Sequence, residues 1–154
     1  MVEKEKKTKT KVKPKTKTKK KVDTQIVRTK RKRAIARAYV SSGTGIIRVN
    51  KMLLSAIDNP YTRAIMSEPL NYVPEKLWSK VDIKINVYGG GQMGQAQAVR
   101  GAIARALVKH ANDNALEEDM LSIDKFLLVE DSRRVEPKKY MGPKARARKQ
   151  KSYR

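Results

Sequence analysis

The segment from Gly89 to Gly94 has the residue types and spacing of a phosphate-binding loop, because it satisfies Gly-x-Gly-x-x-Gly between a strand-like and a helix-like segment. Glycines let a phosphate chain approach the backbone, and a helix start offers N–H groups to an anion. Against a dinucleotide site, the preceding segment alternates polar and apolar residues, whereas a Rossmann strand is apolar on both faces. The acid at the expected distance, Asp113, falls in a polar loop. We interpret the glycines as allowing a nucleic-acid backbone to approach closely; a tight turn alone and a phosphate-binding enzyme are the alternatives.

Candidates for catalysis or metal binding are few. His110 is the single histidine, it falls at the end of an apolar helical stripe, and cysteine is absent. Nucleophile–base pairs and imidazole or thiolate metal sites are therefore mostly excluded. The acids Glu117, Glu118 and Asp119 could bind a hard cation, but they are more typical of a helix start, where the dipole favours negative charge. The sequence predicts no enzyme, no cofactor, no metal and no small-molecule substrate.

Basic residues at the end of the chain suggest a different chemistry. Residues 133–154 hold ten Lys or Arg against one acid, Glu136, and include Tyr140 and Tyr153. Such a segment cannot bury enough apolar surface to offset its ordering entropy, so it should be disordered alone. Cations on about every second position, with tyrosines among them, suit a strand of phosphates flanked by stackable bases. A solvated tail is the alternative, and we favour nucleic acid.

The charge of +22 is concentrated in two arms. Residues 1–33 hold sixteen Lys or Arg and three acids, whereas residues 34–132 hold eleven of each. We therefore divide the chain into a Lys/Thr-rich arm at 1–25, a globular core at 26–132 and the tail at 133–154. Arms of this kind bind polyanions by neutralising phosphates and releasing counterions. An architectural DNA-binding protein is consistent with the charge, but the core shows no obvious dimer or minor-groove wedge.

The membrane is not predicted as a partner. No apolar run approaches the roughly 20 residues that a spanning helix needs. The basic beginning is not followed by the apolar stretch of a secretory signal. We expect a cytoplasmic protein.

The elements that must hold these residues alternate between strand and helix patterns. Residues 26–50 predict a β-hairpin with its turn at Ser41–Gly45, and the basic cluster Lys30–Arg33 lies at its entry. Ala34, Ala36, Ala38 and Val40 should share one face, with Ile35, Arg37 and Tyr39 on the other. That cluster suits a phosphate clamp fixed to the core, or a solvated edge that blocks strand pairing.

The rest of the core predicts short helices over 52–73, with Asn59 or Asp58 as N-cap and Pro60 in the first turn. Trp78 should be a packing anchor. Residues 81–88 alternate as a half-buried strand, and a helix with an apolar stripe follows the glycine loop. Asn114 and Glu117 resemble a capping pair for the next helix. Residues 126–129 suggest a last short strand.

Four of these segments together carry a resemblance to a known family. TKRKRAIARAYV, GGGQMGQAQAVRGAIARALV, DSRR and EPKKYMGPKARARKQKSYR resemble the small-subunit ribosomal protein S9 family in its archaeal and eukaryotic form. The resemblance runs from about Ile26 to Arg154. It implies an α/β fold of the ribosomal S5 domain-2-like class, a two-layer sandwich here with basic N- and C-terminal extensions. It also implies a place in the head of the small subunit, beside other head proteins.

The resemblance implies two RNA partners. The first is the 3′ major domain of small-subunit rRNA. The second is P-site tRNA, whose anticodon stem-loop the family's terminal basic residue touches. The N-terminal arm and the Ser152-Tyr153-Arg154 ending depart from the family pattern. The expected tRNA-binding residues are Lys149, Lys151, Tyr153 and Arg154. The expected rRNA-binding residues are Lys30, Arg31, Lys32, Arg33, Arg37, Gly89, Gly90, Gly91, Gln92, Gly94, Gln95, Arg133, Arg134, Lys138, Lys139, Lys144, Arg146 and Arg148.

Overall fold

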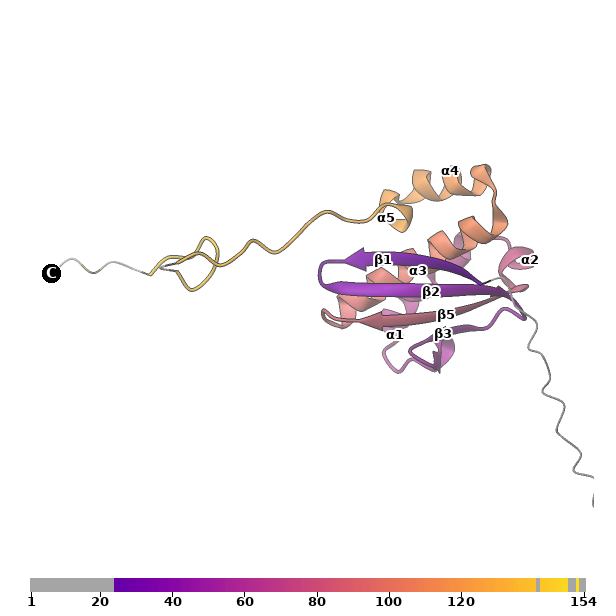
Figure 1. The fold of residues 1–154 in the computed structure, drawn as a ribbon, viewed down its shortest axis with the longest axis horizontal. Helices are drawn as coiled ribbons and strands as arrows, with labels where there is room; N and C mark the ends of the chain where they lie inside the picture. The colour runs from indigo at the N-terminus through magenta and orange to yellow at the C-terminus, as the bar shows by residue number, and fades with distance from the viewer. Residues whose placement is uncertain (1–23, 141, 150–151, 153–154) are drawn as a thin grey trace, which may run out of the picture.

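A computed structural model describes residues 24–140, 142–149 and 152 of the chain. Most of the N-terminal arm therefore lies outside the described residues. The core is a mixed α/β structure of five strands with helices on one side (Figure 1). The elements are β1 (Gln25–Arg31), β2 (Ala34–Ser42), β3 (Ile47–Val49), β4 (Met52–Leu53), the 3-10 turn η1 (Leu54–Ala56), α1 (Pro60–Ser67), the 3-10 turn η2 (Glu68–Tyr72), α2 (Glu75–Trp78), β5 (Val81–Tyr88), α3 (Gln92–Ala111), α4 (Asn114–Ile123) and α5 (Lys125–Leu128).

The sheet has the strand order β1-β2-β5-β3-β4. Strands β1, β2 and β5 are antiparallel neighbours, with Arg28 opposite Arg37 and Arg37 opposite Asn86. Strand β3 runs parallel to β5 and antiparallel to the short edge strand β4. The turn between β1 and β2 and the end of β5 therefore lie at the same end of the sheet (Figure 1).

Alternation along the strands separates a buried face from an open one. Val27, Ala36 and Ile85 are buried on the face that packs against α3, which lies behind the strands in Figure 1. Small residues on both surfaces let the helix approach the sheet. The Thr29 hydroxyl is buried there and donates to the Ala98 carbonyl at 2.6 Å. The predicted strand over 81–88 and the predicted sharing of one face by Ala34, Ala36, Ala38 and Val40 are confirmed.

The predicted hairpin between residues 34–40 and 46–49 is wrong, because β5 lies between these two strands. The Asp82 carboxylate of β5 accepts N–H groups of Thr44 at 2.7 Å and Ile46 at 3.0 Å. Gly43 donates its N–H to the Lys80 carbonyl at 2.8 Å. The loop after β2 therefore wraps around the start of β5. The true hairpin joins β1 to β2, and the basic cluster Lys30–Arg33 includes its turn.

Side-chain caps decide most of the helix starts. Asn59 caps α1, as predicted, with Pro60 in the first turn. The cap of α4 is Asp113, one residue before the predicted Asn114. The predicted strand over 126–129 is wrong, because the Asp124 side chain accepts the Phe126 N–H at 2.8 Å and begins α5 there. Trp78 packs against the core as predicted.

Candidate nucleic-acid interface

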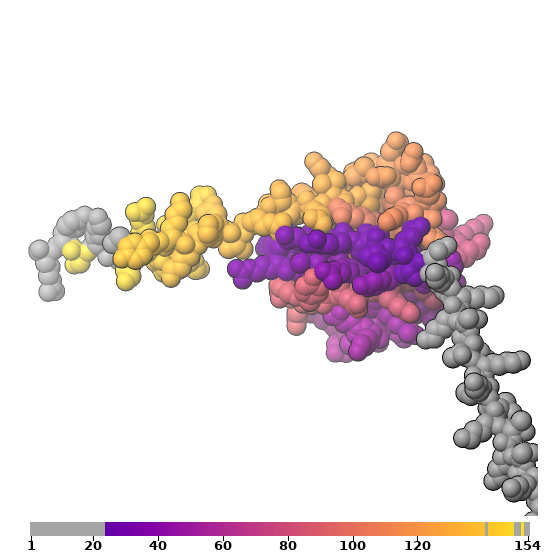
Figure 2. All heavy atoms as spheres, viewed as in Figure 1, coloured from indigo at the N-terminus to yellow at the C-terminus, as the bar shows by residue number. Residues whose placement is uncertain are grey.

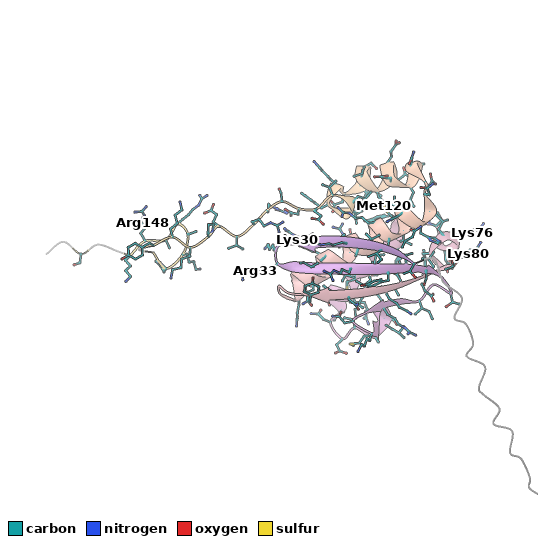
Figure 3. The ribbon with its side chains drawn as sticks, in the orientation of Figure 1. Lys30, Arg33, Lys76, Lys80, Met120 and Arg148 are labelled. Atoms are coloured by element: carbon teal, nitrogen blue, oxygen red, sulfur yellow. The ribbon has the colours of Figure 1, made fainter. Side chains whose placement is uncertain are left out.

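The basic cluster lies at the turn of the β1–β2 hairpin. Arg31 and Ala34 form its last strand pair, so Lys32 and Arg33 are the two loop residues. Lys32 has a φ of 54°, as two-residue hairpin loops that match the strand twist require. Both loop side chains are exposed. The turn therefore presents two cations at one end of the sheet, where Figure 3 labels Lys30 and Arg33.

The glycine loop packs against this turn. Gly89 and Gly90 have φ values of 76° and 65°, which favour glycine. A Cβ at Gly89 would lie 2.6 Å from the Arg33 carbonyl oxygen, so the close approach itself requires glycine. Gln95 donates its side-chain amide to the Gly89 carbonyl at 3.1 Å. The sequence alone did not predict that the glycines are needed for contact with the hairpin turn.

The start of α3 adds backbone N–H groups to this end of the sheet. Its N-cap, Gly91, makes no side-chain capping bond, and Gln92 is the first helical residue. Unpaired N–H groups at a helix start attract anions. Because Gly94 also lies near Arg31, the helix start and the hairpin turn together make a positively charged end of the core. This arrangement suits phosphate groups.

The root of the C-terminal tail is fixed to the same end by Asp131. This carboxylate is only 6% exposed and lies 2.8 Å from Nη1 of Arg31 and 2.6 Å from Nη2 of Arg133. Hydrogen bonds from the Arg133 side chain and backbone, followed by the charge of Arg31, lower the pKa of Asp131 to about 2. The Arg133 guanidinium also lies over the Phe126 ring, 5.6 Å from its centre. Arg134 donates to the Lys32 carbonyl at 2.8 Å.

These contacts give the predicted site residues different surroundings. Arg31 is 15% exposed, because it pairs with Asp131 and donates to the Gln97 side chain at 2.7 Å. Lys32, Arg33 and Arg133 remain exposed to solvent. The part played by Asp131 was missed from the sequence. The available signal was the short polar stretch Glu130-Asp131-Ser132 between the end of an apolar segment and an arginine pair.

The tail leaves the hairpin end and extends away from the core (Figures 1 and 2). Arg146 pairs with Glu136, with Nε 2.9 Å from Oε2, so these two residues close a loop within the tail. This pairing lowers the pKa of Glu136. Figure 3 labels Arg148 far from the core. Beyond the tail root, the exposed cations of the described part of the tail are Lys138, Lys139, Lys144, Arg146, Arg148 and Lys149. Three predicted tRNA-binding residues, Lys151, Tyr153 and Arg154, lie outside the described residues.

The hairpin turn, the glycine loop with the start of α3, and the tail root together form the hairpin-end site. Arg37 is not part of it. It lies on the open face of the sheet, in the middle of β2, with its guanidinium 5.6 Å from the centre of the Tyr88 ring. Three other strands contribute exposed basic residues to this face that were not predicted as site residues: Arg28, Arg48 and Lys84.

The described residues offer little for catalysis or metal binding. Among them, no three His, Asp or Glu side chains are grouped closely enough to hold a metal ion. His110 is exposed near the end of α3. Within the same part of the chain, no helix combines the length and the apolar character that crossing a membrane requires.

Comparison with known proteins identifies the family of this α/β protein. The family model described as ribosomal protein S9/S16 matches residues 29–154. The chain belongs to the ribosomal protein S9 family. A relative, the small ribosomal subunit protein uS9 of Halobacterium salinarum, is 48% identical over 125 residues. The aligned region covers 81% of this chain and 95% of that relative.

Membership of the S9 family supports the archaeal and eukaryotic form that the sequence resembles. The role of the protein is structural, as a ribosomal protein of the small subunit in translation. Family membership also indicates a structural protein without enzymatic activity, and the glycine loop packs against the hairpin turn.

Proposed function

We propose that this S9-family protein anchors on small-subunit rRNA through the hairpin end of its core and carries its tail toward P-site tRNA. The observation that carries the proposal is the meeting of three segments at one end of the sheet. The hairpin turn, the glycine loop with the start of α3, and the tail root are far apart in the sequence, yet Arg134 reaches the Lys32 carbonyl and Gly89 packs on Arg33.

The hairpin end suits the phosphates of folded RNA. Lys32 and Arg33 form a two-residue turn with defined backbone geometry, and Lys30 lies near them on β1, so ordering these side chains on RNA costs less entropy than ordering a free arm. The α3 start supplies N–H groups beside them. Arg31 has a positioning role in this scheme, since its charge is already paired with Asp131. Arg37 on the adjoining strand would extend the contact with rRNA.

The tail would be divided between two RNAs. Its inner cations would follow an rRNA channel, and its last residues would form the free end: the inner set is Arg133, Arg134, Lys138, Lys139, Lys144, Arg146 and Arg148, and the outer set is Lys149, Lys151, Tyr153 and Arg154. From Pro137 the chain can span up to roughly 60 Å when extended. That length is enough to carry its end well away from the core. Opening the Glu136–Arg146 pair would free Arg146 for phosphate.

The proposal also includes the finer features that the resemblance implies. The core would have the ribosomal S5 domain-2-like fold, with residues 1–25 and 133–154 as basic extensions of residues 26–132. Its place would be the subunit head, on the 3′ major domain of the rRNA and beside other head proteins, in the cytoplasm.

Truncation of the tail tests the division between the two RNAs. Deleting residues 149–154 removes three cationic side chains and one tyrosine. At about 1 kcal/mol or slightly more per charge-assisted contact, P-site tRNA affinity should fall roughly ten- to a hundredfold, while incorporation into subunits persists. The measurement is tRNA binding to reconstituted small subunits across a range of salt concentrations.

The matched control for the truncation replaces Lys4, Lys6 and Lys7 by Gln, which removes the same number of cationic side chains from the other arm. Normal assembly of the truncated protein with tRNA bound as tightly as by wild type would contradict the tRNA role. Failure of the truncated protein to incorporate would assign these residues to rRNA anchoring instead.

A further inference from the structure

The face of the sheet opposite α3 is open along strands β1, β2, β5 and β3. No described helix packs on it, and Figure 1 shows β1, β2 and β5 in front of α3. Most side chains that point to this face are polar or exposed, whereas their neighbours along each strand are mostly buried. Even an apolar side chain, that of Ile26, is 57% exposed on this face.

The open face is strongly basic. Arg28 lies opposite Arg37, and Lys84 lies opposite Arg48, so four neighbouring strands each contribute one exposed cation. Among the described strand residues on this face, Asp82 is the single acid. Its carboxylate already accepts the N–H groups of Thr44 and Ile46, and these bonds lower its pKa. The charge of the face is therefore complementary to a polyanion.

A shallow hollow of about 160 Å³ lies within this basic face, lined by Arg48, Lys51, Lys84, Ile85 and Asn86. The turn that carries Lys51 is fixed to β5. The Asn50 side chain accepts the Val87 N–H at 2.9 Å and donates to the Val87 carbonyl at 3.1 Å. Three cations thus surround the hollow on a fixed backbone, so little backbone ordering is needed to bind an anion there.

An aromatic residue lies on the same strand as the hollow. Tyr88 is 47% exposed although the Arg37 guanidinium lies over its ring, and Asn86 stands between it and Lys84. Lys84 and Tyr88 are four residues apart on β5, roughly 13 Å. Unpaired bases stack on exposed aromatic rings and arginine planes, and amides such as Asn86 can bond base edges.

From this arrangement we infer that the open face of the sheet is a second RNA-binding site, which adjoins the hairpin end at Tyr88. A phosphate occupies the hollow at Arg48, Lys51 and Lys84, and an unpaired base of the same strand stacks on Tyr88. The inference rests on the proposed binding of rRNA. An acidic protein segment would use the cations but would not need the tyrosine and the amide.

The first test removes charge from this face and leaves the hairpin end intact. The full-length triple variant Arg28→Gln, Arg48→Gln, Lys84→Gln is compared with Lys76→Gln, Lys80→Gln, Lys109→Gln, which loses the same charge at the end of the sheet remote from the hairpin turn. The probe is a transcript of the 3′ major domain of small-subunit rRNA. Each lost phosphate contact reduces the magnitude of the slope of log affinity against log salt by about 0.7 to 0.9. The slope of the face variant should therefore be smaller than that of wild type by roughly 2 to 3.

The second test addresses the stacked base. Tyr88→Leu should weaken binding of the transcript about tenfold, whereas Tyr61→Leu, on α1 at 64% exposure, should not. Thermal unfolding of each variant shows that the fold is retained. Equal slopes for the two triple variants, or a Tyr88→Leu protein that binds like wild type, would overturn the inference. A wild-type protein that does not prefer this transcript to DNA of equal length would instead overturn the proposed function.

Discussion

At the scale of single residues, Asp131 determines how the tail meets the core. It is buried, and it holds one arginine from β1 and one from the tail within 2.8 Å. A carboxylate that accepts several charge-assisted bonds stays ionised to low pH, which is the reason for its pKa of about 2. The same contacts pair Arg31 within the protein, so a residue that the sequence predicts as a phosphate ligand also holds the tail root in place.

The tail root should therefore respond to pH through Asp131. The folded pKa is about 2, against roughly 3.9 in an unfolded chain, so the stabilisation is present above about pH 4 and is lost as pH falls through about 2. Asp131→Asn should remove it at neutral pH. The measurement is the NMR signal of the Arg133 side-chain Nε–H, which should exchange faster with solvent in this variant than in wild type at the same pH. The pH dependence is followed in wild type by the Asp131 side-chain carboxyl signal, which should shift as the pH falls through about 2.

The matched control for Asp131→Asn is Asp119→Asn, which removes an exposed carboxylate on α4. It should leave the Arg133 signal unchanged. Slow exchange at Arg133 in Asp131→Asn would show that the ion pair does not fix the tail root.

At the scale of elements, the contact between the glycine loop and the hairpin turn joins the two parts of the hairpin-end site. Gly89 and Gly90 adopt left-handed backbone angles, and both lie against the backbone or side chain of the turn. The sheet order makes this contact possible, since β5 pairs with β2 and ends beside it. The α3 start is thereby held next to Arg33.

Gly89→Ala should destabilise the protein by roughly 1–3 kcal/mol, because its φ is 76° and the new Cβ would lie 2.6 Å from the Arg33 carbonyl oxygen. Gly91→Ala is the control, since it has a φ of −105° and no atom within 4 Å of the added Cβ. Its cost should stay below about 1 kcal/mol, as for a cap exchange. Urea unfolding of both variants gives the comparison. Similar losses of stability in the two variants would contradict the packing role of Gly89.

The comparison between sequence and structure separates local signals from non-local ones. Alternation over 81–88 and the apolar stripe of the following helix are local patterns, and both predicted their elements. Strand pairing is not local, so the sequence could not show that β5 separates β2 from β3. The Asp124 cap overrode the strand-like composition of 126–129. The pairing of Arg31 with Asp131 was also not predictable, because these residues lie far apart in the sequence.

At the scale of the whole molecule, the buried apolar residues are confined to the core. They run from Val27 to Leu128, and residues 132–140 are all exposed. The described part of the tail has no apolar core of its own, so its order depends on ion pairs such as Glu136–Arg146, which is exposed and weak. A neutral body between basic segments can fold first and bind RNA afterwards.

We predict that residues 26–132 fold without RNA. In the free protein, amides of β2 and β5 should exchange slowly with solvent, because these central strands are paired on both sides. Amides of residues 1–25 and 133–154 should exchange fast. Hydrogen exchange followed by NMR makes the comparison, and slow, dispersed signals from residues 1–25 would contradict the division into core and arms.

The most direct measurement of the central claim, that the hairpin end anchors the protein on rRNA, is the salt dependence of binding to the 3′ major domain. The variant Lys30→Gln, Lys32→Gln, Arg33→Gln keeps Arg31 and its pair with Asp131. Its plot of log affinity against log salt should be flatter than that of wild type by roughly 2 to 3. Lys76→Gln, Lys80→Gln, Lys109→Gln should leave the slope as in wild type. An unaltered slope in the hairpin variant would contradict the account.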